Sequence, residues 1–239
     1  MCGSIVVEDH DQRLERSLPS RQGRLLFVYL VVHRDRQTPR PEIIEALWPN
    51  GGPEDADGAL NALLSRLRRA LGSNRIESRG TLRLALGDDA SVDLEDADEA
   101  IRRAESAVAL GEWERAWAAS LVSMFVAKRG FLPGEDAIWI DQIRRHLDDL
   151  HIRSLETYGT AGLGLGGTEL AAAHSAGRTL VRLAPLREGG HRLLMRALVA
   201  EGNTAEALRV YENLRCLLRD ELGVTPSDAS QELHRQLLG

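Results

Sequence analysis

Polar and basic side chains gather along one face of a helix predicted at about residues 55–71. An α-helix turns by about 100° per residue, so apolar residues three and four positions apart share one side. That side holds five leucines, namely Leu60, Leu63, Leu64, Leu67 and Leu71. The opposite side holds Asn61, Ser65, Arg68 and Arg69, with Arg66 toward its flank. Arginine can bond guanine edges or phosphates, asparagine can bond adenine edges and serine can bond either, so this face predicts a contact with DNA.

The alternative is an ordinary solvated helix face. Such faces usually mix the two signs of charge, often as Glu–Lys pairs four residues apart. Here no Asp or Glu occurs from Ala59 to Arg75. The absence of acids favours a polyanionic partner over a merely solvated surface.

Two further helices are predicted before this one. Ser20 is a suitable N-cap for the first, because an apolar run follows it. Pro39 and Pro41 break the chain, and Pro41 suits the first turn of a second helix that ends near Trp48. Residues 49–53, Pro-Asn-Gly-Gly-Pro, then form a loop.

Short strands flank the three helices. Residues 4–18 predict a short, partly irregular β-hairpin. Gly72 is a suitable C-cap for the third helix, and residues 75–78 and 81–86 predict a second hairpin. The order of strands, three helices and hairpin predicts a winged helix-turn-helix over residues 1–92.

The second hairpin, the wing, carries three arginines. Arg79 lies beside Gly80 at the turn and is the best placed to reach a minor groove or phosphates. Arg83 lies within a strand, where a contact with DNA and a solvated charge are equally good interpretations. Arg75 lies at the start of the hairpin.

Beyond residue 93 only helices are predicted. They cover about 94–110, 112–127, 135–161, 168–183, 187–201, 204–222 and 227–238. A Gly-x-x-x-x-Ala step begins at Gly111, Gly167 and Gly202. The spacing between Gly167 and Gly202 is close to the period of about 34 residues of a tetratricopeptide repeat. This step predicts a tetratricopeptide-like all-α domain over 93–239, with a generic helical bundle as the alternative. The fold class is mainly α with small β.

Charge is divided unequally between these two parts. The whole chain has a net charge of −6. Residues 13–83 contain 13 Arg against 8 acidic residues, whereas residues 94–239 contain 17 basic against 22 acidic residues. A basic N-terminal domain joined to an acidic C-terminal one suits a protein that binds DNA with one part and protein with the other.

Composition excludes several other classes. Hydrophobic residues make up 43 % of the 239 residues, enough to bury a core in each domain. No apolar run of about 18 residues predicts a membrane span, and the N-terminus has no signal-peptide pattern. Cys2 and Cys216 are too far apart in sequence to suggest a disulfide framework. We therefore expect a cytoplasmic protein with no membrane partner.

No catalytic, cofactor or metal site is predicted. Gly162–Gly167 resembles a glycine-rich phosphate loop, but a helix precedes it and no Gly-Lys-Ser/Thr follows, so a flexible connection between helices is the better interpretation. His146 and His151 fall on different helix faces with no further ligand nearby in sequence. We therefore expect no enzyme activity.

Three tryptophans are open to two interpretations. Trp113 and Trp117 share one face of one helix, and Trp139 begins another. Core packing between helix pairs is the first interpretation. One wall of a groove for a peptide or small effector is the second.

Several motifs together resemble a known family. The N-terminal half contains RQGRLLFVYLVVHRDRQTPRPEIIEALWP, the loop NGGPEDAD and the helix ALNALLSRLRRALG. The C-terminal half contains WIDQIRRHLDDLHIRSLE, the PLRE segment and ELGVTPS. The chain resembles actinobacterial regulators of the SARP/AfsR type, in which an OmpR-like winged helix precedes a bacterial transcriptional activator domain. The resemblance covers nearly the whole chain.

The resemblance implies a transcription activator, often of secondary-metabolite genes. Such proteins bind direct-repeat promoter sites as two protomers side by side, and they recruit RNA polymerase. It places Ser65, Arg66, Arg68 and Arg69 on the recognition helix. It also implies that the loop Pro49–Asp57 can touch polymerase and that Trp48 is a core residue.

The resemblance is imperfect in three respects. The wing of the family normally ends Gly-Tyr-Arg-Leu, whereas here Gly80 is followed by Thr-Leu-Arg-Leu, so its register is open. The first strand looks trimmed at Met1. Larger members carry further domains, so this chain is either a small stand-alone regulator or a piece of a larger one.

Two functions remain after this comparison. The favoured one is a sequence-specific DNA-binding regulator that uses Asn61, Ser65, Arg66, Arg68 and Arg69, with Arg79 on the wing. The alternative is a helical-repeat adaptor that binds other proteins and has no role in DNA recognition.

Overall fold

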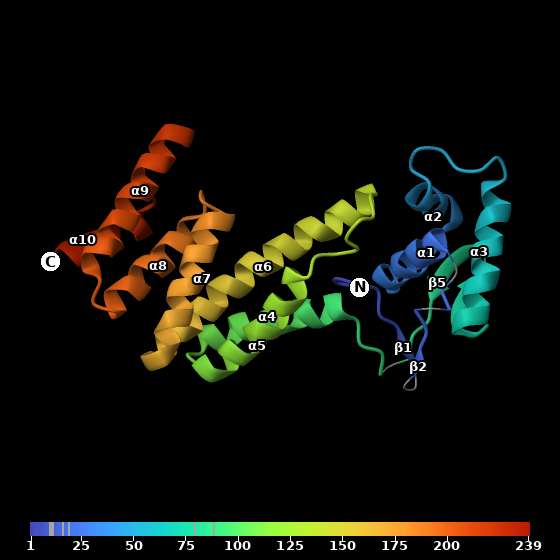
Figure 1. Cartoon of the computed structure of the whole chain (residues 1–239), viewed down its shortest axis with the longest axis horizontal. Helices are drawn as coiled ribbons and strands as arrows, with labels where there is room; N and C mark the ends of the chain where they lie inside the picture. The colour runs from blue at the N-terminus through green and yellow to red at the C-terminus, as the bar shows by residue number, and fades with distance from the viewer. Residues whose placement is uncertain (10–11, 16, 19, 79, 88) are drawn as a thin grey trace. The chain divides into compact units, whose positions relative to one another are not determined.

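The computed structural model describes residues 1–9, 12–15, 17–18, 20–78, 80–87 and 89–239 (Figure 1). Contacts divide the chain into two compact units. The first comprises Met1–Val92 and Gly130–Arg145, and the second comprises Asp93–Arg129 and His146–Gly239. The sequence predicts a domain boundary after residue 92. The contacts differ from this in one respect, because residues 130–145 pack with the N-terminal unit.

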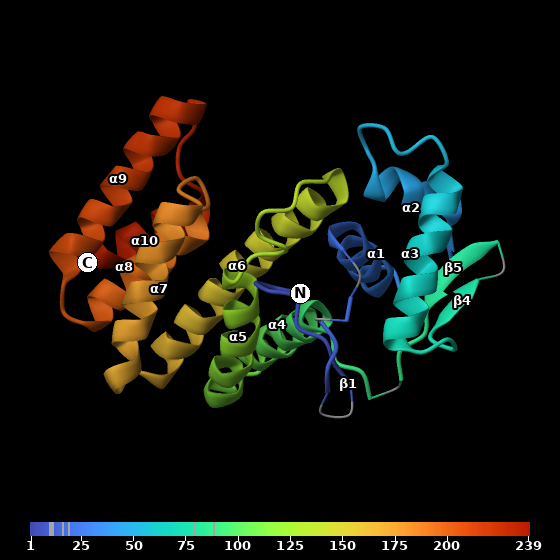
Figure 2. The same ribbon diagram turned by 45° about the vertical axis from the view of Figure 1, so that its right-hand side comes forward.

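The first unit has the predicted order of strands, three helices and hairpin, with one further strand between the first two helices. The elements are β1 (Glu8–Asp9), β2 (Gln12–Arg13), α1 (Arg21–Val32), β3 (Thr38–Pro39), α2 (Arg40–Leu47), α3 (Ala56–Leu71), β4 (Ile76–Ser78) and β5 (Thr81–Leu84). β1 and β2 form a separate antiparallel hairpin. The other three strands form a sheet in the order β3-β5-β4, and Figure 2 shows its β4–β5 hairpin beside α3.

Strand β3 was not predicted from the sequence, because Pro39 was interpreted only as a chain break. The two-residue strand pairs antiparallel with β5, with Thr38 opposite Leu82 and Pro39 opposite Thr81. Proline lacks a backbone N–H and is tolerated on an edge strand, and β3 is at the edge of this sheet.

Local capping explains where the helices of this unit begin and end. Ser20 caps α1 and its side chain accepts a hydrogen bond from the backbone N–H of Gly23 at 3.4 Å. Asp55 caps α3 in the same way through the N–H of Gly58 at 2.8 Å. Gly72, with φ of 100°, ends α3 in a conformation that side chains with a Cβ rarely adopt.

The core of the first unit lies between the three helices and β5. Its fully buried side chains include Leu26, Leu30, Ile43, Leu60, Leu64, Leu67, Leu82 and Leu84. Each contributes about 1.5–3 kcal/mol by leaving water. This core fixes one face of α3 inward and leaves the opposite face exposed.

The segment Gly130–Arg145 adds an aromatic contact to this unit. The side chain of Trp139 is 8 % exposed, and its Nε1 donates a hydrogen bond to the carbonyl of Ala46 at 3.2 Å. Its ring meets Tyr29 edge-on, with centroids 5.2 Å apart, and Phe131 at 6.1 Å. Trp139 is therefore a core residue, but of the N-terminal unit and not of a helix pair in the C-terminal half.

The second unit is an array of antiparallel helices, as predicted. They are α4 (Asp93–Ala109), α5 (Trp113–Lys128), α6 (Ile138–Leu165), α7 (Leu170–Leu183), α8 (Glu188–Ala200), α9 (Thr204–Leu222) and α10 (Asp228–Leu238), with a 3₁₀ turn at Gly167–Glu169. The main packed pairs are α4 with α5, α7 with α8 and α8 with α9. Helix α6 belongs to the first unit up to Arg145 and to the second from His146.

The glycines after residue 161 are not a flexible connection throughout, contrary to the prediction. Gly162 and Gly164 lie within α6, and a Cβ on Gly164 would come within 2.3 Å of the Trp113 ring. A Cβ on Gly162 would lie 3.1 Å from the ring of Trp117. These two glycines therefore give the tryptophan rings of α5 a flat helix surface to pack against. For Trp113 and Trp117 this contact agrees with the interpretation of core packing between helices.

Candidate nucleic-acid interface

Helix α3 is strictly two-sided. Its five leucines are buried, with exposures of 9 % or less. The exposed positions are Asp57 in the first turn and, beyond it, Asn61, Ala62, Ser65, Arg66 and Arg69. Four of them, Ala62, Ser65, Arg66 and Arg69, are spaced by three, four and seven residues and form the line farthest from the leucines. We call these four residues the outer stripe of α3.

The structure reverses the expected positions of two arginines. Arg66 is exposed on the outer stripe, although it was predicted at the flank. Arg68 was predicted on the polar face but is half-buried, and its Nη2 donates a hydrogen bond to the carbonyl of Ile76 at 3.4 Å. The reason is rotational, because position 68 lies only about 80° from Leu60 and faces strand β4. Arg68 thus connects α3 to the wing.

Asn61 is held by an arginine from the preceding helix. Arg40 Nη2 donates to Asn61 Oδ1 at 2.8 Å, and Arg40 Nε donates to Asp57 Oδ1 at 3.2 Å. A guanidinium can only donate, so the amide oxygen of Asn61 must face it. The two N–H groups of the amide remain available, whereas one of the two lone pairs of its oxygen is engaged, which favours contacts through the donors over the donor–acceptor pair that binds adenine.

Ala62 was missed by the sequence prediction. It is exposed between Ser65 and Arg66 on the outer stripe. Its spacing of three, four and seven residues from Ser65, Arg66 and Arg69 could have indicated in the sequence that it shares their face of the helix. A methyl group at such a position can contact the methyl group of thymine in a major groove.

The wing has a defined register. Ile76 pairs with Leu84, Glu77 with Arg83 and Ser78 with Leu82. Arg83 is exposed, and its Nε donates to the carbonyl of Arg34 at 3.1 Å, which ties β5 to the end of α1. The Gly80-Thr-Leu-Arg-Leu stretch thus pairs without the aromatic residue that the family pattern has.

Three wing residues remain to be placed, namely Arg75, Arg79 and Gly80. Arg79, predicted at the tip, lies outside the described residues. Arg75 is half-buried at the start of the hairpin. Gly80 has φ of 83°, which a residue with a Cβ would rarely adopt at this turn.

The loop between α2 and α3 is open to solvent along most of its length. Residues 49–55 are all exposed. Trp48 ends α2 and is half-buried, with its side chain against Gly52. The loop is thus anchored by Trp48 while its backbone stays accessible to a partner.

An ion-pair network joins α1 and α2 behind the interface. Tyr29 Oη donates to Glu42 Oε1 at 2.7 Å, and Arg36 pairs with both oxygens of the same carboxylate. The hydrogen bond from Arg36 lowers the pKa of Glu42 to about 2, and burial raises the pKa of Tyr29 to about 12. At neutral pH this network therefore keeps one charge state and serves to fix the two helices that support α3.

Comparison with known proteins identifies the family. The model of the bacterial transcriptional activator domain matches residues 82–238. The chain belongs to the bacterial transcriptional activator domain family. The match spans well over half of the chain and covers every helix of the second unit.

Relatives of this activator-domain protein are regulators. It is 32 % identical over 224 residues to the regulatory protein AfsR of Streptomyces griseus and 34 % identical over 221 residues to AfsR of Streptomyces coelicolor. Each alignment covers 92 % of this chain but only 22 % of AfsR. The transcriptional regulatory protein MoaR1 of Mycobacterium tuberculosis is 23 % identical over 247 residues, covering all of this chain and 78 % of MoaR1.

A solved structure has the same fold. Mycobacterium tuberculosis EmbR, determined in complex with a low affinity phosphopeptide, superposes with a TM-score of 0.87 at 20 % identity. The match covers 99 % of this chain and 63 % of that one. The resemblance to SARP/AfsR-type regulators is thereby confirmed, as is the mainly helical fold with a small sheet. No helix in the described part of this activator-domain protein has the length and apolarity needed to cross a membrane.

Proposed function

We propose that this chain is a sequence-specific DNA-binding activator that places α3 in the major groove. The observation that carries the proposal is the outer stripe of α3. Ser65, Arg66 and Arg69 are exposed there, free of acidic neighbours on the stripe, while the opposite face of the helix is buried. A helix of this kind fits a major groove about 12 Å wide.

The residues of the interface take different roles in this proposal. Arg66 and Arg69 contact guanine edges or phosphates, and a well-oriented arginine–guanine pair discriminates by about 1–3 kcal/mol. Ser65 and Ala62 contact neighbouring base edges. Asn61 donates to a base or phosphate acceptor, because Arg40 occupies its oxygen.

Recruitment of transcription machinery is the second part of the proposal. Residues 49–55 form an exposed loop beside α3, in the position where the family resemblance implies a contact with RNA polymerase. We propose that two copies bind adjacent direct repeats, with half-sites about 10–10.5 base pairs apart, so that both recognition helices face the same side of the duplex. Such a role is carried out in the cytoplasm and requires no catalytic step.

The test is selection of bound fragments from a random duplex pool, read by sequencing. The full chain is compared with Arg66→Ala/Arg69→Ala and with a control of equal charge loss away from α3, Arg13→Ala/Arg24→Ala. We expect an enriched motif, preferably repeated, that the first variant loses and the control retains. Circular dichroism checks that the helices are intact in both.

Two outcomes would contradict the proposal. Loss of the motif in both variants to the same extent would mean that net charge, and not the outer stripe, binds DNA. Absence of any enrichment at low salt, where phosphate contacts alone hold DNA, would favour a helical adaptor that binds only protein.

A further inference from the structure

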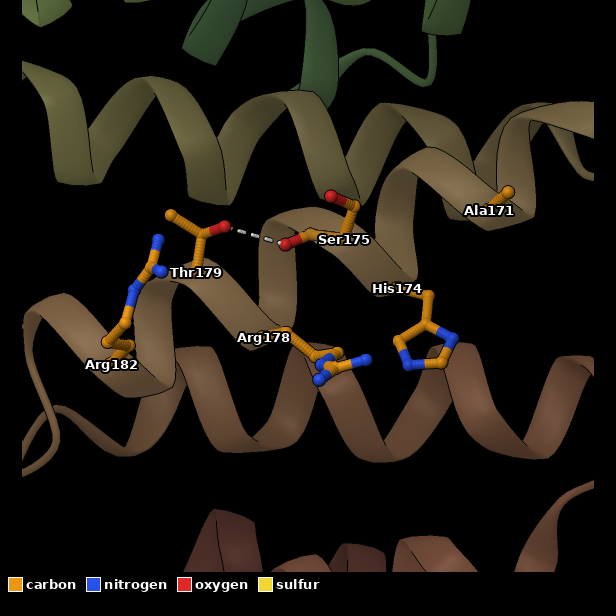
Figure 3. A pocket seen from close by; sticks show the side chains of 6 residues that line it. All are labelled: Ala171, His174, Ser175, Arg178, Thr179 and Arg182. Carbon is orange, nitrogen blue, oxygen red and sulfur yellow. Dashed lines mark hydrogen bonds between the residues drawn. The ribbon is translucent and has the colours of Figure 1, made fainter.

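A polar hollow runs along helix α7 in the second unit (Figure 3). Its volume is about 570 Å³, and all of its six lining residues come from this one helix. They are Ala171, His174, Ser175, Arg178, Thr179 and Arg182. No acid is among them, and four of the six are exposed, so the hollow is an open strip rather than an enclosed pocket.

The two arginines of the hollow have no partner of their own. In the part of the chain that the structure describes, neither Arg178 nor Arg182 forms an ion pair or a side-chain hydrogen bond. Other arginines of the unit are paired; Arg153, for example, binds Glu105 through two bonds of 2.8 Å. Both residues are exposed. In Figure 3 the guanidinium group of Arg182 extends toward Thr179 and that of Arg178 toward His174.

The nearby acid is already engaged. Glu201 Oε2 accepts a hydrogen bond from Nδ1 of His174 at 2.9 Å. The hydroxyl of Thr179 donates to the carbonyl of Ser175 at 2.9 Å, as the dashed line in Figure 3 marks. The hollow thus presents two uncommitted cationic groups, which a carboxylate would satisfy by charge-assisted hydrogen bonds.

We propose that this hollow binds an acidic peptide segment of a partner protein in extended conformation. Arg178 and Arg182 are four residues apart, so their Cα atoms lie on one face of α7 about 6 Å apart along the helix axis. Alternate residues of an extended chain are about 6.4–6.8 Å apart and point the same way. The spacing therefore fits two acidic residues at positions i and i+2 of the peptide.

Charge favours peptide over nucleic acid at this site. Residues 94–239 carry 22 acidic against 17 basic residues, so the surrounding domain repels a long polyanion such as DNA. A short peptide with a few acids, separated by neutral residues, carries less negative charge than DNA and is repelled less by the surrounding domain. A small organic ligand is disfavoured because such sites are usually enclosed and mostly apolar. The proposal does not depend on DNA binding by α3.

The test measures binding of a fluorescent peptide to the full chain by anisotropy. The probe is Gly-Asp-Ala-Asp-Ala-Asp-Gly, and its neutral counterpart has Asn in place of each Asp. Wild-type protein is compared with Arg178→Gln/Arg182→Gln and with Arg102→Gln/Arg196→Gln, which removes two exposed arginines of the same unit outside the hollow. Circular dichroism checks that both variants fold, as expected for substitutions of exposed side chains.

We expect the acidic probe to bind and the neutral one not to bind. The hollow variant should weaken binding about tenfold, since each exposed ion pair contributes several-fold, and the control should not. Equal weakening in both variants, or no binding of the acidic probe at about 50 mM salt, would overturn the proposal. A parallel loss of duplex DNA affinity in the hollow variant would also overturn it, because the hollow would then contact phosphates.

Discussion

Glu188 at the start of α8 accepts hydrogen bonds from Ser227, although the two residues are 39 positions apart. The backbone N–H of Ser227 lies 3.0 Å from the carboxylate and its hydroxyl 2.7 Å. Ser230 adds a further bond through its hydroxyl. Glu188 thereby caps the N-terminus of α10 from another helix, where a negative charge is also favoured by the helix dipole. This contact joins the PLRE and TPS motifs of the family pattern.

Substitution of Glu188 should loosen α10. We expect Glu188→Gln to lower the free energy of unfolding by about 1 kcal/mol, the usual value of a helix cap. Urea denaturation followed by circular dichroism measures this change. Glu221→Gln, an exposed acid on α9, is the matched control and should change stability little. Equal effects of both substitutions would refute a special role for Glu188.

The same contact predicts a pH dependence. Burial raises the pKa of Glu188, but the hydrogen bonds from Ser230 and Ser227 outweigh it, and the net shift is downward. A carboxyl whose pKa is lowered in the folded state stabilises the fold above its unfolded pKa, near 4.3. That stability is lost as the pH falls through the lower folded pKa. The difference in unfolding free energy between wild type and Glu188→Gln should therefore shrink between neutral and acidic pH, and a difference that stays constant would contradict this account.

Gly177 of α7 should be difficult to replace. A Cβ at this position would lie 2.9 Å from the backbone N and Cα of Leu194. Backbone cannot move aside, so Gly177→Ala should destabilise the protein by about 1–3 kcal/mol despite the better helix propensity of alanine. The control is Gly189→Ala in α8, where the added methyl meets only the flexible end of Glu156. Thermal denaturation should show a loss for the first variant alone, and a neutral Gly177→Ala would disprove such close packing.

Sequence predicted the elements well because their signals are local. The capping residues Ser20 and Asp55 and the stop at Gly72 lie within a few residues of the helix ends they define. The leucine period of α3 is likewise contained within the helix itself, from Leu60 to Leu71. The helices of the second unit were predicted within a few residues for the same reason.

What sequence could not predict depends on distant partners. Trp139 donates to Ala46 across 93 positions, so its place in the first unit has no local signal. Gly164 could be recognised as a packing residue only once Trp113 was known to lie over it. The exchange of Arg66 and Arg68 is different, because the helical period alone places position 68 about 80° from Leu60; only its contact with strand β4 needed the structure.

Arg68 should act on affinity and not on base preference. Its guanidinium contacts the carbonyl of Ile76 and so supports the wing against α3. We expect Arg68→Ala to weaken binding to all DNA sequences by a similar factor, whereas Arg66→Ala should change the preferred base at one position by about 1–3 kcal/mol. Sequencing of selected fragments for both variants distinguishes these effects. A changed base preference in Arg68→Ala would place this side chain in the groove instead.

Arg40 should determine specificity without contacting a base. Because its Nη2 holds the oxygen of Asn61, the asparagine presents its N–H donors, which suit the N7 and O6 acceptors of guanine. Arg40→Met keeps the length of the side chain and removes its donors. The freed amide can then make the two-bond contact with adenine, so the preference at one base pair should move toward adenine.

The control for this prediction is Arg36→Met. Arg36 pairs with Glu42 behind the interface, so its loss should leave every base preference unchanged while lowering stability slightly. Fragment selection with both variants, at one fixed salt concentration, measures the effect position by position. A preference that is unaltered in Arg40→Met would show that the amide of Asn61 makes no base contact. A change spread over all positions would show that Arg40 holds the whole helix in place and does not act through Asn61 alone.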